Sequence, residues 1–418
     1  MPAPVCAAAS GAQGDISMTK ATRMQKVARA AFILLIAAML FLFFTNDFGL
    51  VDIHKASIVV AVGVDVTEEG YDVTAQAAIP TPAQGEGSAA YTQVTGSGAT
   101  VADAVDDINA KTGFYPKLAF CNLVVLGESC AQKDIFTVLD YFYRNDYVPL
   151  TALVGMCRGS AKELLGQKPS DGGMSSSAIQ RAMSEELKNS ANASTVNLKL
   201  LAQDAGSPSA SSYMPLIEFS QGGSGGSTTA SSGGSKSSGG SSQSSGGGEN
   251  SAEFTCLTTA AFTGGAFVGI LDEDMAFALN ILRSEIRLAV VNCVYDGENY
   301  TVGLKNDSSE MRMEAEAGAP VLKIKYRALA NVQAAESRPA AEGSANSHLV
   351  KDGVLQSVAD TIESRMSSLM DFCVQNGCDL VGVKKMLYQR RYNDYLAFKD
   401  TALSVLKVKY DIKIESVR

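Results

Sequence analysis

The chain has 418 residues and a formal net charge of −9, and 46% of its residues are hydrophobic while 19% are charged. This apolar fraction excludes a chain that is disordered throughout, and the length suits two or three domains, each with its own core. The net charge is modest and no long run of Lys and Arg occurs, so we expect no nucleic-acid partner.

An apolar segment lies close to the N-terminus. Residues 30–44 contain no polar side chain, and they follow four basic residues, Lys20, Arg23, Lys26 and Arg29. A basic flank before an apolar helix predicts that residues 1–29 stay in the cytoplasm while the rest of the chain crosses to the other side. We therefore expect a single-pass, N-in membrane protein with an extracytoplasmic body.

The apolar run alone is short for a membrane span. As a helix, residues 30–44 reach about 22 Å, less than the ~30 Å core of a bilayer, so a cleavable signal peptide and a buried core helix remain alternatives. No small-x-small cleavage site follows at residues 45–47, and extension to Val51 restores the length. These features predict an uncleaved signal-anchor or transmembrane helix over residues 30–51. Residues 1–17 lack periodicity and are interpreted as a start-site artefact, because Met18 resembles a natural start.

The cysteines do not form a recognisable framework. Seven of the eight follow the predicted anchor, scattered through apolar runs, and neither CxxC nor zinc-ligand spacing occurs. We expect small buried hydrophobic side chains, with a bridge between Cys373 and Cys378 as the alternative. The sequence accordingly predicts no metal site and no cofactor.

A Gly/Ser-rich tract occupies residues 221–250 and predicts a flexible, disordered linker. It either separates two folded parts, at residues 52–220 and 251–418, or forms a long loop between them. Residues 222–226 formally match the nucleophile motif G-x-S-x-G, but the strand before and the helix after that this motif requires are missing. We interpret the match as chance.

Predicted strands and helices alternate in residues 52–220. Residues 56–66 and 71–79 predict an antiparallel hairpin. A helix follows between Thr100, a natural N-cap, and Gly113, a natural stop. Further strands are expected at 117–127 and 150–157, and further helices at 134–144 and 160–165. This alternation predicts a mixed α/β domain.

Residues 251–418 predict an α+β domain. Two strands, 254–262 and 266–270, precede a helix that Asp272 caps. Three more strands are expected at 300–305, 310–317 and 321–332. The longest helix, 349–376, ends at Gly377, and a final strand at 406–415 alternates apolar and charged residues and can pair with the preceding strands.

Three groups of motifs occur in a fixed order along these two parts. The first comprises Gly63-Val64-Asp65, Leu126-Gly127-Glu128, Arg144-Asn145-Asp146 and the run 159–165; the second comprises residues 259–262 and 268–273; the third comprises residues 378–382, the run 388–391 and Tyr395. In order and spacing they resemble the Ger(x)C, or GerAC, family of spore germination proteins. Each piece is weak by itself, and the three in order are specific.

The chain departs from this family near the expected anchor. Members usually carry a lipobox, Gly-Cys-Trp-Asp, and the matching residues here are Gly49-Leu50-Val51-Asp52. The acylated Cys is thus replaced by Leu50. The chain also lacks Trp, with Ile270 and Tyr395 where the family often has one. These differences leave the expected fold unchanged and predict an anchor without a lipid.

The resemblance implies an α+β fold in which a single N-terminal membrane anchor precedes mixed α/β and α+β extracytoplasmic domains. It also implies a non-catalytic C subunit of a spore nutrient-germinant receptor, with membrane-embedded A and B subunits as partners. The expected location is the inner spore membrane, with the soluble body on its outer side. The resemblance supplies no catalytic residues and does not say whether this subunit contacts the germinant.

Two other classes of function remain open. An extracytoplasmic hydrolase is disfavoured because the two histidines, His54 and His348, lie in no recognisable catalytic or metal motif. Asp379 is a candidate general base, but its place before a helix favours an N-cap. A membrane-anchored solute-binding or envelope-stabilising protein would share the anchor and the extracytoplasmic body.

A basic and aromatic segment follows Asp379. Its side chains suit contact with a protein partner or with anionic headgroups, and the candidates are Lys384, Lys385, Arg390, Arg391 and Tyr395. The alternative is a solvated cationic helix face whose apolar side lies in the core.

Overall fold

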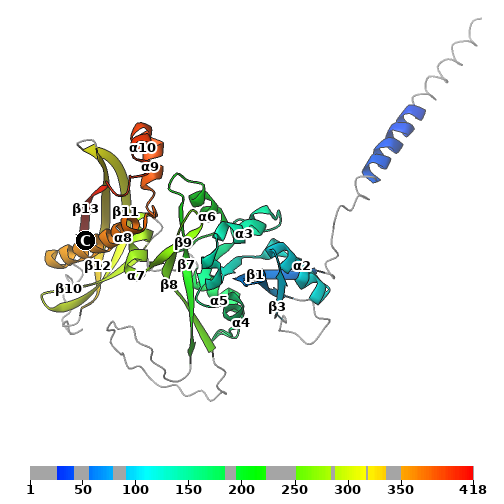
Figure 1. The fold of residues 1–418 in the computed structure, drawn as a ribbon, viewed down its shortest axis with the longest axis horizontal. Coiled ribbons are helices and arrows are strands. Elements are labelled where there is room, and N and C mark those ends of the chain that lie inside the picture. Colours follow the sequence, from blue (N-terminus) through cyan, green and yellow to red (C-terminus); the bar gives the residue numbers. More distant parts are fainter. Residues whose placement is uncertain are drawn as a thin grey trace, which may run out of the picture. The chain divides into compact units, whose positions relative to one another are not determined.

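The computed structural model describes residues 26–41, 56–78, 91–183, 194–222, 251–283, 288–316, 319–335 and 350–417. The chain divides into two compact units, residues 1–53 and residues 54–418 (Figure 1). All sheets of the described residues belong to the second unit.

The first unit contains a helix over residues 26–41. Its long apolar side chains, including Phe32, Leu35 and Phe41, are exposed. Among the described residues, no helix combines the length and the apolar character that crossing a membrane needs. Residues 42–51 of the expected anchor and the expected artefact at 1–17 lie outside the described residues, so both remain predictions.

The first sheet of the second unit has the strand order β3-β2-β1-β5-β6-β7-β8-β9, with β4 paired to β1. Strands β1, β5, β6 and β7 run parallel, and antiparallel neighbours flank them on both sides. The strands are β1 Ala56–Val66, β2 Tyr71–Ala78, β3 Tyr91–Gly98, β4 Tyr115–Lys117, β5 Leu123–Leu126, β6 Leu153–Cys157, β7 Ser211–Gly222, β8 Ser251–Thr263 and β9 Ala266–Leu271.

Helices cover both faces of the parallel strands, so alternate residues of β5 enter two cores. Val124 and Leu126 pack into the larger core, whereas Leu123 and Val125 pack against the helices α4 and α5. Burial on both faces is typical of parallel strands and explains their continuous apolar sequence. The helices of this region are α2 Val101–Thr112, η2 Leu118–Phe120, η3 Glu128–Gln132, α3 Ile135–Arg144, α4 Ala161–Gly166, α5 Ser175–Ala182 and α6 Leu198–Ala205.

Local sequence signals place several of these helices. Thr100 accepts a hydrogen bond from the Asp103 amide at the start of α2, and Gly113 ends that helix with a left-handed φ of 69°. Asp134 caps α3, and Ser160 caps α4. The Thr100 cap, the stop at Gly113 and the hairpin β1–β2 confirm the sequence-based predictions, and so do the helices expected at 134–144 and 160–165.

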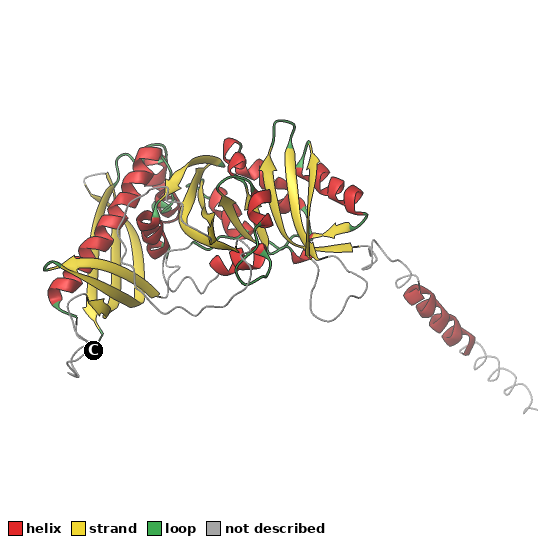
Figure 2. Ribbon diagram, turned by 90° about the horizontal axis from the view of Figure 1, so that it is seen from below, coloured by secondary structure: helices red, strands yellow, loops and turns green. Residues whose placement is uncertain are grey.

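The second sheet has the order β10-β11-β12-β13, and the long helix α8 packs on one face (Figure 2). Ion pairs such as Lys323 with Glu314 and Lys409 with Glu316, each 2.6 Å, lie on the other face. Strand β13 runs parallel to β12 at one edge. The elements are α7 Glu273–Leu282, β10 Leu288–Tyr295, β11 Glu298–Glu316, β12 Ala319–Ala335, α8 Asp352–Asn376, α9 Val383–Arg390, α10 Tyr392–Phe398 and β13 Lys407–Ser416.

Some predicted strands differ from the observed ones. The separate strands expected at 300–305 and 310–317 are wrong: β11 is one strand, whose register shifts between Lys305 and Ser308. The shift changes which alternate residues face the core. The apolar alternation in the sequence is therefore interrupted at this point, although the strand itself continues. The single strand expected at 117–127 is also wrong, because η2 interrupts it between β4 and β5. The predictions missed β3, β7, β10, α5 and α6.

The Gly/Ser-rich tract connects two neighbouring strands of one sheet. Gly222 at the end of β7 pairs with Ser251 at the start of β8, and the pairing continues to Ser211 and Thr263. The boundary expected at residue 251 therefore falls within the first sheet, to which β8 and β9 belong. Residues 223–250 themselves lie outside the described residues.

We predict that replacing residues 223–250 by an Asn-Gly turn leaves the protein folded and its Tm unchanged or higher. The two strand ends are already paired, and each halving of a flexible loop's length lowers the cost of closing it by about 0.6 kcal/mol. Thermal unfolding of the two proteins, followed by circular dichroism, makes the comparison. A Tm several degrees lower would show that the tract contributes contacts to the folded state.

Candidate functional site

Asp65 joins the carboxyl ends of three parallel strands. Its carboxylate accepts hydrogen bonds from the Ser160 hydroxyl at 2.9 Å and from the amides of Ala161 at 2.9 Å and Lys162 at 3.1 Å. These donors lie at the N-terminus of α4, where a negative charge is favoured. The Gly-x-Asp step of β1 thus fixes the helix that follows β6.

The neighbouring strand β5 contributes two more motif residues to this cluster. A side chain at Gly127 would collide with the Asp65 carboxylate, so glycine at this position lets the carboxylate keep its hydrogen bonds to the start of α4. Glu128 exchanges two contacts with Gly159: its amide donates to the Gly159 carbonyl, and its carboxylate accepts from the Gly159 amide at 2.9 Å. Three of the four motifs of the first group, those at residues 63–65, 126–128 and 159–165, therefore meet at the carboxyl ends of the parallel strands and perform a structural task there.

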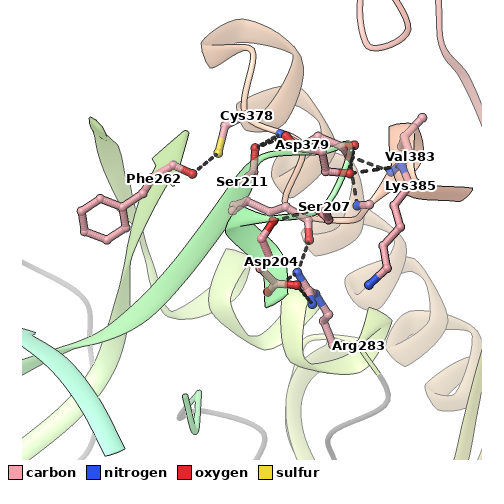
Figure 3. Close-up of polar contacts among 12 residues, drawn as sticks. Asp204, Ser207, Ser211, Phe262, Arg283, Cys378, Asp379, Val383 and Lys385 are labelled. Carbon is pink, nitrogen blue, oxygen red and sulfur yellow. Dashed lines mark hydrogen bonds and ion pairs between the residues drawn. The ribbon is translucent and has the colours of Figure 1, made fainter. Parts of the chain in front are cut away.

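Asp379 forms a second cluster, and it is only 1% exposed. One carboxylate oxygen accepts from the amides of Gly382 at 3.0 Å and Val383 at 2.8 Å. The other accepts from the Lys384 amide at 2.7 Å and from the Ser209 hydroxyl at 2.6 Å (Figure 3). Four donors satisfy the buried charge, which is the condition for burying a carboxylate without a large cost.

Two serines contribute to this cluster: Ser209 lies in the loop before β7, and Ser211 is the first residue of β7. The Asp379 amide donates to the Ser211 hydroxyl at 2.9 Å, and Ser209 also accepts from the Lys385 amide at 3.2 Å. Asp379 therefore holds the start of α9 against the N-terminal end of β7. The sequence predicted Asp379 as the N-cap of α9, but the N-cap position is Gly382; the Asp379 carboxylate nevertheless accepts the first amides of the helix from three residues earlier. The serine partners, about 170 residues away in sequence, could not be foreseen.

An ion pair lies beside the Asp379 cluster. Arg283, just after α7, contacts Asp204 at 3.1 Å, and its guanidinium also donates to the Leu380 carbonyl at 3.0 Å. The same guanidinium stacks over the Tyr213 ring, 5.0 Å from its centroid. Figure 3 shows this pair next to Asp379. Two acidic side chains and one basic side chain thus join α6, α7, β7 and the loop after α8.

This geometry does not resemble a catalytic site. Both oxygens of Asp379 already accept two hydrogen bonds each, and the side chain is buried, so no substrate proton can reach it. No group of three or more potential metal ligands occurs among the described residues. His54 and His348 lie outside the described residues.

The seven described cysteines are buried and free, and they include Cys373 and Cys378. The alternative of a bridge between these two is therefore not observed, and the interpretation as buried hydrophobic side chains is confirmed. Burial raises the pKa of the Cys121, Cys256 and Cys373 thiols to about 12. Such thiols stay protonated at neutral pH and are poor nucleophiles. Cys6 lies outside the described residues.

The predicted contact residues lie on two consecutive helices. Lys384, Lys385 and Arg390 belong to α9, Arg391 lies between the helices, and Tyr395 belongs to α10. Figure 1 shows the two helices side by side at the end of the second sheet. Together with Tyr388, Tyr392 and Leu396, these five residues are called the α9–α10 surface below.

The aromatic rings of this surface form a cluster that the sequence pattern did not predict. The Tyr388 ring lies 5.6 Å from that of Tyr392 and 5.2 Å from that of Tyr395, both edge to face. Tyr388 and Tyr392 nevertheless remain 49% and 52% exposed. The three tyrosines are spaced i, i+4 and i+7, which would place their rings on one face of a continuous helix. Because the chain breaks between α9 and α10, this spacing did not by itself predict the cluster.

We predict that Asp379→Ala lowers the free energy of unfolding by about 3 kcal/mol, because it leaves three amides at the start of α9 uncapped and the buried Ser209 hydroxyl without its acceptor. Asp379→Asn should cost nearly as much, since one of its two acceptor oxygens becomes a donor that faces other donors. Urea unfolding of the purified protein measures both.

Asp272→Ala is the matched control for this prediction. Asp272 caps α7 by accepting from the Met275 amide at 2.8 Å, but it is exposed and has no distant partner. Its replacement should cost about 1 kcal/mol. Equal losses for the two alanine variants would contradict the tertiary role of Asp379.

The two parts of the chain match two family models. Residues 50–219 match the family model described as the spore germination protein N-terminal domain, and residues 258–417 match the one described as spore germination B3/GerAC like, C-terminal. The search of curated proteins found no match. A solved structure, titled the crystal structure of the GerBC protein, is 16% identical, with a TM-score of 0.49, and the alignment covers 85% of this chain and 97% of that one.

The family matches and the residue motifs agree in order. The N-terminal match contains Asp65, Gly127 and the helix α4, whereas the C-terminal match contains Asp272, Asp379 and the α9–α10 surface. The gap between the matches contains the Gly/Ser-rich tract. These two consecutive domains show that the chain belongs to the GerAC, or Ger(x)C, family of spore germination proteins.

Proposed function

We propose that this chain is the non-catalytic C subunit of a spore nutrient-germinant receptor and that it acts by assembling with membrane-embedded A and B subunits. The observation that supports this most is the pair of family domains, which together cover most of the chain in the expected order. The family models describe germination proteins and not a known class of enzymes.

The chemistry of the body is consistent with an assembly role. The half-buried carboxylate of Asp65 and the buried carboxylate of Asp379 hold helices in place, and the body's described thiols are buried. Groups that reach solvent include the exposed Tyr388, Arg390 and Tyr392 of the α9–α10 surface. An assembly role would use such surface groups.

We propose further that residues 30–51 hold the chain in the inner spore membrane as one uncleaved N-in helix, with the body on the outer side. The basic residues before this segment and its apolar run support this orientation. The family's acylated Cys is replaced by Leu50, which has no thiol to modify.

Deleting the gene should abolish or strongly slow germination in response to nutrients, because a receptor that lacks one subunit cannot transmit the signal. Release of dipicolinate from purified spores measures the response. Spore yield and heat resistance should stay normal, and the intact gene supplied elsewhere should restore the rate. Normal nutrient germination without the gene, in a strain with no second copy of it, would overturn the receptor assignment.

The native protein should sediment with membranes yet incorporate no labelled fatty acid. A Leu50→Cys variant is the matched comparison, because it restores the thiol of the family's lipobox and is expected to gain label. Growth with a radioactive or clickable fatty acid, followed by purification, gives the readout. Label on the unaltered chain would contradict the proposed anchor, and so would its recovery in the soluble fraction.

A further inference from the structure

The α9–α10 surface carries an excess of positive charge on an acidic protein. Residues 383–398 contain four basic side chains and one carboxylate, whereas the formal net charge of the chain is −9. Arg391 pairs with that carboxylate, Asp394. Lys384, Lys385 and Arg390 form no ion pair with any described residue. Three positive charges are therefore left for another molecule.

Aromatic and apolar groups lie among these charges. Tyr388, Tyr392 and Leu396 are 49%, 52% and 54% exposed, an unusual degree for consecutive turns of two short helices. Lys384 precedes Tyr388 by four residues and so lies on the same side of α9. Tyrosine rings have an apolar body and a polar tip, which favours the boundary between water and a bilayer.

The surface is held rigidly on the body. Val383 and Leu387 of α9 are buried in the large core, and the first amides of α9 donate to Asp379. Helix α9 therefore needs no folding step before it binds, which lowers the entropic cost of binding.

We propose that the α9–α10 surface is a peripheral binding site for the headgroups of anionic phospholipids, with the tyrosine rings and Leu396 at the bilayer interface. Lys384, Lys385 and Arg390 supply the charge, since each basic side chain near an anionic membrane raises affinity by roughly fivefold. Tyr and Arg suit a protein interface as well, but the adjacent Lys384 and Lys385 favour the lipid, because Lys is depleted in protein interfaces and attracted to anionic membranes. The inference goes beyond the proposed function and needs no other subunit.

A single Trp at the surface provides the test, because the chain contains none. The full chain with Tyr392→Trp is mixed with vesicles of phosphatidylcholine, with or without about 30% phosphatidylglycerol, whose acyl chains are brominated. The emission should shift to the blue and be quenched at least about threefold more strongly with the anionic lipid. About 0.5 M NaCl should remove the difference, because it shortens the screening length.

Two controls separate this result from non-specific attraction. Tyr147→Trp places the probe at a 69% exposed loop position outside the surface and should show no such difference. Adding Lys384→Glu, Lys385→Glu and Arg390→Glu to the Tyr392→Trp chain should abolish the quenching. The same charge change at the exposed Lys133, Lys162 and Lys199 should leave the quenching intact, and Tm values show that each variant is folded.

Equal emission in neutral and anionic vesicles would overturn the proposal. If the probe stays exposed in both and becomes shielded only when A and B subunits are added, the surface binds protein, and the lipid assignment is wrong. Failure of this test leaves the germination phenotype of the deletion unaffected, so the two proposals are tested separately.

Discussion

The buried carboxylate of Asp379 is the interaction on which the arrangement of the C-terminal helices depends. A single side chain satisfies three amides at the start of α9 and the hydroxyl of Ser209, which precedes β7. Removing an ion from water is costly, and only the full set of donors offsets that cost. The loop after α8 therefore cannot leave the first sheet without exposing an unsatisfied charge or losing the helix cap.

A similar interaction between a carboxylate and a helix N-terminus occurs at the carboxyl ends of the parallel strands of the first sheet. Asp65, the second-last residue of β1, accepts hydrogen bonds from the amides at the start of α4 and from a serine hydroxyl, as Asp379 does at α9. In both places a carboxylate meets the positive end of a helix. The two family domains thus use one kind of polar contact to attach a helix to strands that are distant in sequence, while apolar packing supplies most of the stability.

Local patterns in the sequence were sufficient for most helices. Thr100, Asp134 and Asp272 are caps next to the helices that they begin, so their role is visible within a few residues. The family resemblance likewise depended on local motifs. Strand β7 and the partners of Asp379 were not predictable in this way, because β7 and Ser209 are placed by contacts with residues far along the chain. The register shift in β11 interrupts the apolar alternation, so the sequence predicted two strands where the structure has one.

The position of the α9–α10 surface follows from these constraints. The amide of Lys384 is bound to Asp379 while its ammonium group has no described partner, so one residue belongs both to the buried cluster and to the exposed surface. Displacing α9 requires breaking the cap and moving Val383 and Leu387 out of the core. Because Asp379 is bonded to Ser209, a force on this surface is resisted by the first sheet as well as the second. The α9–α10 surface is therefore attached to residues of both family domains.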